Sequence, residues 1–156
     1  MYKMLLNILL AAAIFLTLLN TGTASAACSV SATPVSFGSY DTFSPSPTDT
    51  TGSVIVTCDE QQPPRVIAAI SQSASSGTFS PRWMHLATGS DVLEYNIYTN
   101  KQYTKIWGDS SGNTYTESSA VKENKPWVST LYARIPAGQD VSAGSYNDTL
   151  TVTITW

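Results

Sequence analysis

The sequence has little charge, few cysteines and almost no histidine. Only 12% of its 156 residues are Asp, Glu, Lys or Arg, about half the usual share. The 8 basic residues are outnumbered by 11 acidic ones, so no basic surface is available to bind nucleic-acid phosphates. The residue bias of coiled coils is also missing. The length fits one domain, and an aromatic content of 10% argues against disorder.

The first 26 residues have the pattern of a cleaved signal peptide. Lys3 precedes an apolar run at 5–19, and small residues at 24–26 follow with the spacing that signal peptidase recognises. A membrane anchor would need about 20 apolar residues, which is more than this run provides. We predict cleavage after Ala26, export, and a mature domain over residues 27–156 with no membrane span.

The two cysteines, Cys28 and Cys58, are therefore expected in an oxidising compartment. Two cysteines in a small exported domain usually pair, and we favour a disulfide. The alternative is a lipidated Cys28 close to the cleavage site, although Ser25 stands where such signals carry a leucine-like residue. With His85 as the only histidine, a four-ligand zinc site is not expected, and we predict no metal and no cofactor.

The mature chain is predicted to form successive short strands. β-Branched and aromatic segments separated by Gly-, Pro- and Ser-rich turns favour strands at 53–58, 65–70, 92–98, 130–135 and 149–156. No later segment sustains a helical period. We therefore predict an all-β fold, an antiparallel β-sandwich.

The C-terminal segment has the clearest alternation of the chain. Apolar residues alternate with threonines, which places Leu150, Val152, Ile154 and Trp156 on one face of a strand. Such a strand offers an edge that natural proteins rarely leave bare. Either it lies inside the sheet or pairs with the N-terminal segment, or another polypeptide adds a strand beside it. Composition alone favours the first alternative.

Motifs that resemble catalytic sites do not carry the required chemistry. The segment GDSSG at 108–112 has the form of a serine-hydrolase loop, but a strand pattern follows it where a helix is required, and His85 precedes the serine. Asp59 and Glu60 are adjacent and would point to opposite faces of a strand, which makes them a poor glycosidase pair. The aromatic residues could form a sugar-stacking platform, but they are more often core. We predict that the protein is not an enzyme.

A series of motifs occurs in order along the mature chain. They are PVSFGSY at 34–40, GSVIVTC at 52–58, PRWM at 81–84, LEYNIYT at 93–99, IWGDSSG at 106–112, YARIPAGQDVSAGSY at 132–146 and DTLTVTITW at 148–156. Together, and in this order, they resemble the spore coat protein U domain family. The resemblance covers essentially the whole mature chain, with Cys28 and Cys58 where that family places its disulfide.

The resemblance implies a subunit of an archaic, Csu-type chaperone–usher pilus, a fibre that mediates surface attachment and biofilm formation. Subunits of this kind have an immunoglobulin-like sandwich that lacks its last strand. A periplasmic chaperone lends a strand, and the N-terminal extension of a neighbouring subunit replaces it as the outer-membrane usher assembles the fibre. On this resemblance, the partner strand binds along Leu150, Val152, Ile154 and Trp156, and the protein is located at the cell surface.

One departure from the family concerns the N-terminus. Polymerising subunits carry an alternating donor segment before the first cysteine, whereas the predicted mature chain starts next to Cys28. We therefore expect a subunit that accepts a strand but gives none, at a fibre end or in an accessory position. The alternative is a stand-alone secreted coat or carbohydrate-binding domain. Trp83, Met84 and Trp127, in or near segments expected to be loops, are candidates for apolar surface contact, unless they belong to the core.

Overall fold

The computed structural model describes residues 28–58, 65–122 and 125–156. In these ranges every helix-or-strand element is a β-strand. The predicted signal peptide and the Asp59–Glu60 pair lie outside the described residues. The strands are β1 Cys28–Thr33, β2 Thr48–Cys58, β3 Val66–Ile70, β4 Arg82–Leu86, β5 Val92–Tyr98, β6 Glu117–Ser119, β7 Trp127–Ile135, β8 Tyr146–Asn147 and β9 Val152–Thr155. Among the described residues, no helix has the length and hydropathy to cross a bilayer.

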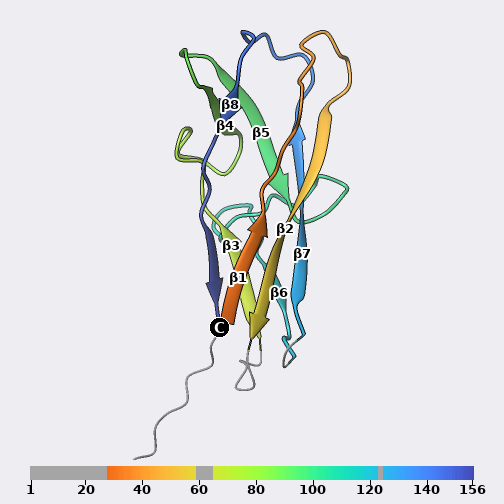
Figure 1. The fold of residues 1–156 in the computed structure, drawn as a ribbon, viewed down its shortest axis with the longest axis vertical. Coiled ribbons are helices and arrows are strands. Elements are labelled where there is room, and N and C mark those ends of the chain that lie inside the picture. Colours follow the sequence, from red (N-terminus) through yellow and green to blue (C-terminus); the bar gives the residue numbers. More distant parts are fainter. Residues whose placement is uncertain (1–27, 59–64, 123–124) are drawn as a thin grey trace, which may run out of the picture.

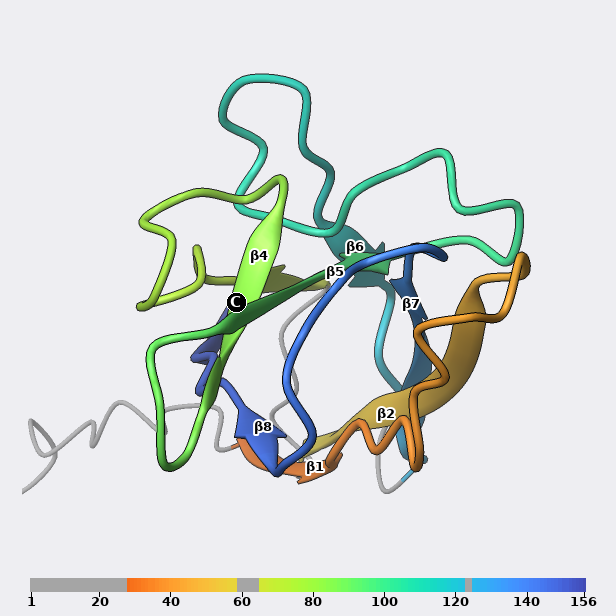
Figure 2. The ribbon, with the colours of Figure 1, turned by 90° about the horizontal axis from the view of Figure 1, so that it is seen from above.

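The strands form two antiparallel sheets. The larger sheet has the order β1-β2-β7-β5-β4-β8 and the smaller one β6-β3-β9. Figure 1 shows β1, β2 and β7 running along the long axis, with the loops that follow β1, β4 and β7 gathered at the upper end. Seen from above in Figure 2, the larger sheet is strongly curled. The all-β, antiparallel prediction is confirmed.

The sequence of β2 forms a strand with one buried face. Val54, Val56 and Cys58 are buried, whereas the residues between them are only partly covered. Gly52 continues this buried face, and a Cβ there would lie 2.8 Å from the carbonyl oxygen of Thr33 and 3.2 Å from Val35. A side chain at position 52 would therefore push away the chain that follows β1.

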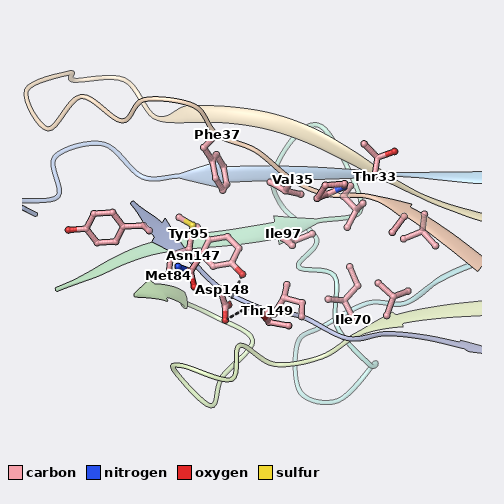
Figure 3. A pocket seen from close by; sticks show the side chains of 17 residues that line it. Thr33, Val35, Phe37, Ile70, Met84, Tyr95, Ile97, Asn147, Asp148 and Thr149 are labelled. Carbon is pink, nitrogen blue, oxygen red and sulfur yellow. Dashed lines mark hydrogen bonds between the residues drawn. The ribbon is translucent and has the colours of Figure 1, made fainter. Parts of the chain in front are cut away.

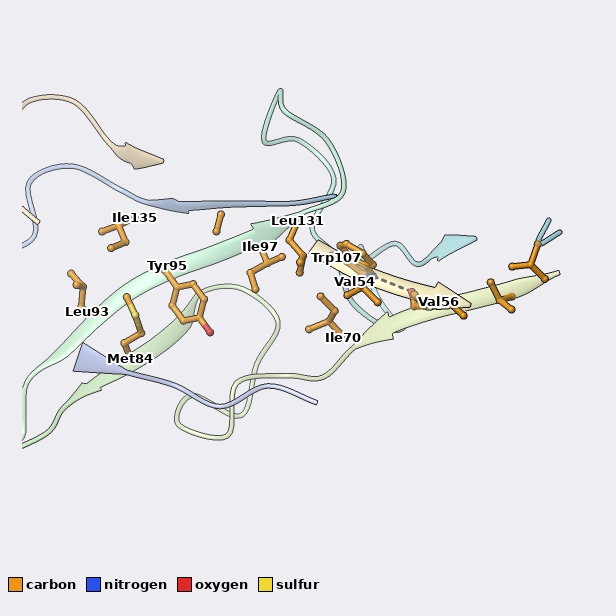
Figure 4. Close-up of a cluster of buried hydrophobic side chains, with 14 of the residues drawn as sticks. Val54, Val56, Ile70, Met84, Leu93, Tyr95, Ile97, Trp107, Leu131 and Ile135 are labelled. Atoms are coloured by element: carbon orange, nitrogen blue, oxygen red, sulfur yellow. Dashed lines mark hydrogen bonds between the residues drawn. The ribbon is translucent and has the colours of Figure 1, made fainter. Parts of the chain in front are cut away.

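The core lies between the two sheets and is built from apolar side chains of both. Figure 4 shows Val54, Ile70, Ile97, Leu131 and other members converging from β2, β3, β5 and β7. Trp107 is fully buried, and its indole N–H donates a hydrogen bond of 3.0 Å to the carbonyl oxygen of Ala68. The aromatic residue thus satisfies its one polar atom while it fills the centre of the sandwich.

The predicted disulfide is confirmed. Cys28 is bonded to Cys58, and the two residues stand opposite each other at one end of the β1–β2 pair. The disulfide covalently links the first described residue of the domain to the last residue of β2. By chain entropy, a cross-link of this sequence separation, 30 residues, contributes about 3–4 kcal/mol.

Four strands were not expected from the sequence, namely β1, β4, β6 and β8. The prediction that Trp83 and Met84 lie in a loop is wrong, because both belong to β4. Trp127 is likewise not in a loop but begins β7. Met84 is buried and Trp127 packs against the core. Strand β4 was not predicted because Arg82 is charged and yet fully buried, so the segment lacks the apolar pattern expected of a buried strand.

Candidate functional site

A cleft of about 440 Å³ opens on one side of the sandwich, between the end of β1 and the start of β9. Figure 3 shows Val35 and Phe37 on one wall, Asp148 and Thr149 on the other, and Ile97 between them. The lining is Ala32, Thr33, Pro34, Val35, Phe37, Val54, Ile70, Met84, Tyr95, Ile97, Leu131, Tyr146, Asn147, Asp148, Thr149, Leu150 and Val152. Most of these side chains are apolar, so the cleft exposes part of the core.

Two sheet edges border this cleft. β1 pairs with β2 on one side and β9 pairs with β3, and no strand in the described part of the chain pairs with the other edge of either. Each edge strand therefore presents backbone N–H and C=O groups without a ladder partner on that side.

The exposure of inward-facing side chains shows that the interior is uncovered between the two edges. Val30 stands directly opposite Val56 in the register, so both point to the same face of the sheet. Val56 is 0% exposed and Val30 is 45% exposed. On the other side, Val152 lies opposite the buried Ile70 and is itself only half-buried. The apolar interior is therefore uncovered between β1 and β9.

The backbone of the β9 segment directs hydrogen-bonding groups to both of its sides. The amide of Ser71 donates to the carbonyl oxygen of Thr151 at 2.9 Å, and the amide of Thr151 donates to Ser71 Oγ at 3.0 Å. Backbone groups alternate between the two sides of an antiparallel strand. Because Thr151 faces β3, the N–H and C=O groups of Leu150 and Val152 face the open edge.

One end of the cleft is polar. The hydroxyl of Tyr95 donates to Asp148 Oδ2 at 2.7 Å, as Figure 3 shows, and the amide of Thr149 donates to Asp148 Oδ1 at 2.8 Å. Burial raises the pKa of Tyr95, and the hydrogen bond to the Asp148 carboxylate acts in the same direction. The phenol is therefore protonated at any physiological pH and holds the carboxylate in one orientation.

The four residues predicted to bind a partner strand occupy different positions. Leu150 and Val152 line the cleft. Ile154 is half-buried and packs against the core farther along β9, whereas Trp156 lies beyond the end of β9 and is 53% exposed. The structure thus brings two of the four into the cleft and leaves the other two outside its lining.

The opposite wall was missed by the sequence reasoning. Val35 and Phe37 follow β1 with the same alternation that identified the C-terminal segment, in the motif PVSFGSY at 34–40, and this alternation was the available signal. Met84 and Tyr95 belong to β4 and β5, and only the fold brings them to the cleft.

The residues considered for catalysis do not assemble. His85 is exposed on β4. Ser110 in GDSSG has its hydroxyl 3.1 Å from Thr116 Oγ1, and the carboxylate of Asp109 accepts the amide of Ser111. Within the described ranges, no group of three or more His, Cys, Asp or Glu side chains could hold a metal ion.

Comparisons with known proteins place these features in a family. The sequence model of the Spore Coat Protein U domain matches residues 14–153. Protein U of Myxococcus xanthus is 32% identical over 84 residues, which are 54% of this chain and 45% of that protein. The chain therefore spans less than half the length of this curated relative.

A solved structure shares the fold. It is the chaperone–tip adhesion subunit pre-assembly complex from archaic chaperone–usher Csu pili of Acinetobacter baumannii, with a TM-score of 0.59 and 24% identity over 86% of this chain and 41% of that one. The likeness shows an immunoglobulin-like antiparallel sandwich. Since the family match extends over residues 14–153, the chain belongs to the spore coat protein U domain family.

Proposed function

We propose that the protein is an exported subunit of a chaperone–usher type pilus and that its cleft accepts a β-strand from another polypeptide. The observation that carries this proposal is the apolar cleft between the unpaired edges of β1 and β9. The donor of the strand would be a periplasmic chaperone first and a neighbouring subunit afterwards, with an outer-membrane usher assembling the fibre.

A strand is the occupant that suits both properties of the cleft. Its backbone pairs with the exposed N–H and C=O groups along the edges, and every second side chain enters the apolar interior. The half-exposed Val30 and Val152 would then be covered as completely as their neighbours in the sheets. A small apolar molecule would cover the same side chains but would leave the backbone edges without partners.

The comparisons support the same assignment. The family match and the fold shared with a chaperone-bound pilus subunit are consistent with a subunit that meets a chaperone. We extend this to a role at the cell surface in attachment and biofilm formation. If export removes residues 1–26, the mature chain brings no donor segment of its own before Cys28, which favours a fibre end or an accessory position.

The test is the response of the purified mature chain to synthetic donor peptides. Twelve-residue peptides that alternate valine and threonine are added, and thermal unfolding is followed together with molecular mass in solution. A ligand at about 100 times its Kd adds about 2.7 kcal/mol of stability, which corresponds to a rise in Tm of about 5–10 °C. The control peptide has the same length with two central prolines, which cannot pair in a ladder.

The opposite result has an equally clear meaning. A stable monomer whose Tm no peptide of the panel changes would overturn the pilus assignment and favour the stand-alone coat or carbohydrate-binding domain. The intact mass of the same preparation tests processing, because cleavage after Ala26 leaves residues 27–156, and a lipidated Cys28 would add the mass of an acylated glyceryl group.

A further inference from the structure

The cleft contains one charged side chain. All lining residues other than Asp148 are apolar or neutral at physiological pH. Asp148 lies between β8 and β9, where the chain crosses from the larger sheet to the smaller one, and it is only half-buried. A strand that fills the cleft beside β9 would pass over this carboxylate.

The cation nearby does not form an ion pair with Asp148. Arg82 is fully buried, and its charge attracts Asp148. Its guanidinium donates instead to neutral acceptors, including the carbonyl oxygens of Ser71 at 3.0 Å and Trp107 at 2.8 Å. Among the described residues, no salt bridge reaches Asp148.

The carboxylate retains capacity to accept hydrogen bonds. Oδ2 accepts the hydroxyl of Tyr95 and Oδ1 accepts the amide of Thr149, and each carboxylate oxygen can accept about two. These two bonds also fix the direction in which the remaining lone pairs point. An arriving strand with only apolar side chains would remove water from those lone pairs and supply no hydrogen-bond donor in its place. Leaving the carboxylate without that partner costs free energy.

We infer that the strand that fills this cleft carries a lysine or arginine whose side chain faces the cleft and pairs with Asp148. This inference rests on the proposed function. A charge-assisted hydrogen bond replaces the lost water, and the aliphatic stem of either residue packs along the apolar lining. Asp148 then selects both the partner and the register in which its strand enters.

The experiment is a lysine scan of the donor peptide. In a series of alternating valine–threonine peptides, one valine at a time is replaced by lysine, and Kd is measured by fluorescence anisotropy. The peptide with lysine at one particular position is expected to bind about five- to tenfold more tightly than the unsubstituted valine–threonine parent, because it forms a close interfacial charge pair. The gain should shrink at high salt and disappear when norleucine, which has no charge, replaces that lysine.

Variants of the protein locate the effect. Asp148→Asn should abolish the preference for lysine while the parent peptide still binds, and Tyr95→Phe should weaken it because the carboxylate loses one of its two orienting bonds. Asp140→Asn is the matched control, since it makes the same change of charge at an exposed position outside the cleft lining.

The outcomes separate the two proposals. If the parent peptide binds but no lysine position improves the Kd, or if Asp148→Asn keeps the preference, this inference is overturned and the strand-acceptor function stands. If no peptide of either kind binds, the proposed function fails and this inference fails with it.

Discussion

Arg82 is a charged residue that holds the interior together. It is 0% exposed, and its two Nη atoms donate to the carbonyl oxygens of Phe79, Ser71 and Trp107 and to Asn96 Oδ1 at distances from 2.8 to 3.2 Å. These acceptors belong to β5 and to two connecting segments, the one between β3 and β4 and the one between β5 and β6. One side chain therefore fixes two irregular stretches that have no ladder of their own.

Replacing Arg82 with methionine keeps an unbranched side chain but removes all four hydrogen bonds. Because buried acceptors are left without partners, we expect a loss of about 3–5 kcal/mol in the free energy of unfolding. Urea denaturation measures it, with Arg65→Met as the control at an exposed arginine. A similar small loss in both variants would show that the Arg82 network is not a main support of the fold.

Asp49 and Arg134 form an ion pair on the outside of the β2–β7 pair. Both carboxylate oxygens of Asp49 accept from the guanidinium at 2.7 Å, which also lies 3.7 Å from the centre of the Tyr103 ring. The hydrogen bond to Arg134 lowers the pKa of Asp49. A carboxyl group whose pKa is lower in the folded state stabilises the fold above its unfolded pKa, and this contribution disappears as the pH falls through the folded value.

Asp49→Asn is therefore expected to cost less than about 1 kcal/mol at pH 7, because the pair is exposed. The difference from the unmodified protein should shrink as the pH falls below the unfolded pKa of Asp49 and through its lower folded pKa, because the carboxyl group is then protonated in both states. Unfolding in urea at neutral pH and at a pH below the folded pKa measures it, and Asp140→Asn serves as an exposed control. A difference of equal size at both pH values would contradict the assignment to this ion pair.

At the level of whole elements, the sequence predicted strands best where apolar residues recur regularly on one face of the strand. Strands β2, β3, β5 and β7 lie within or around the predicted segments. β9 is shorter than predicted, because residues 148–151 cross between the sheets before the ladder with β3 begins. β4 was missed because Arg82 is charged, and β8 has only two residues, too few to show any period.

The direction of backbone groups along β9 gives a test at the same scale. Val152→Pro removes an N–H that faces the open edge, so the β3–β9 ladder should survive and proline is tolerated at such an edge. Binding of the donor peptide should weaken about five- to tenfold, because one inter-strand hydrogen bond is lost and the ring hinders approach.

Thr153→Pro is the matched control for that variant. Residue 153 faces β3 by the same alternation, so proline there should destabilise the protein by about 1–3 kcal/mol. Thermal unfolding and peptide anisotropy on both variants separate the effects. If Val152→Pro unfolds as readily as Thr153→Pro, the N–H of Val152 does not face the open edge.

At the scale of the molecule, the cleft is made by segments from the two ends of the domain. The PVSFGSY segment at 34–40 and the DTLTVTITW segment at 148–156 each show alternation in the sequence, although only the second was predicted as a strand. Their meeting across an uncovered interior follows from the sheet order β1-β2-β7 and β3-β9, which no local pattern encodes. The sequence could thus predict an edge but not the second edge that faces it.

If the uncovered space is that of one strand, the chain should be able to supply it itself. β9 and β1 run in opposite directions in Figure 1, so a strand added after Trp156 through an Asn-Gly turn would return antiparallel to β9 and enter the cleft. Because the added strand is tethered, its effective concentration is in the millimolar range. We expect Tm to rise by about 10 °C and binding of free donor peptides to be lost.

The control for this extension has the same length and carries two adjacent prolines in place of a central valine and the threonine beside it, which removes an N–H on each edge of the added strand. Differential scanning calorimetry measures Tm, and fluorescence anisotropy measures peptide binding, for the two proteins. A higher Tm with unchanged peptide binding would mean that the extension stabilises some other surface, whereas closure of the cleft requires both changes together. The pairing of these two readouts separates a missing strand from a general gain in stability, because only the occupant of the cleft competes with a donor for β1 and β9.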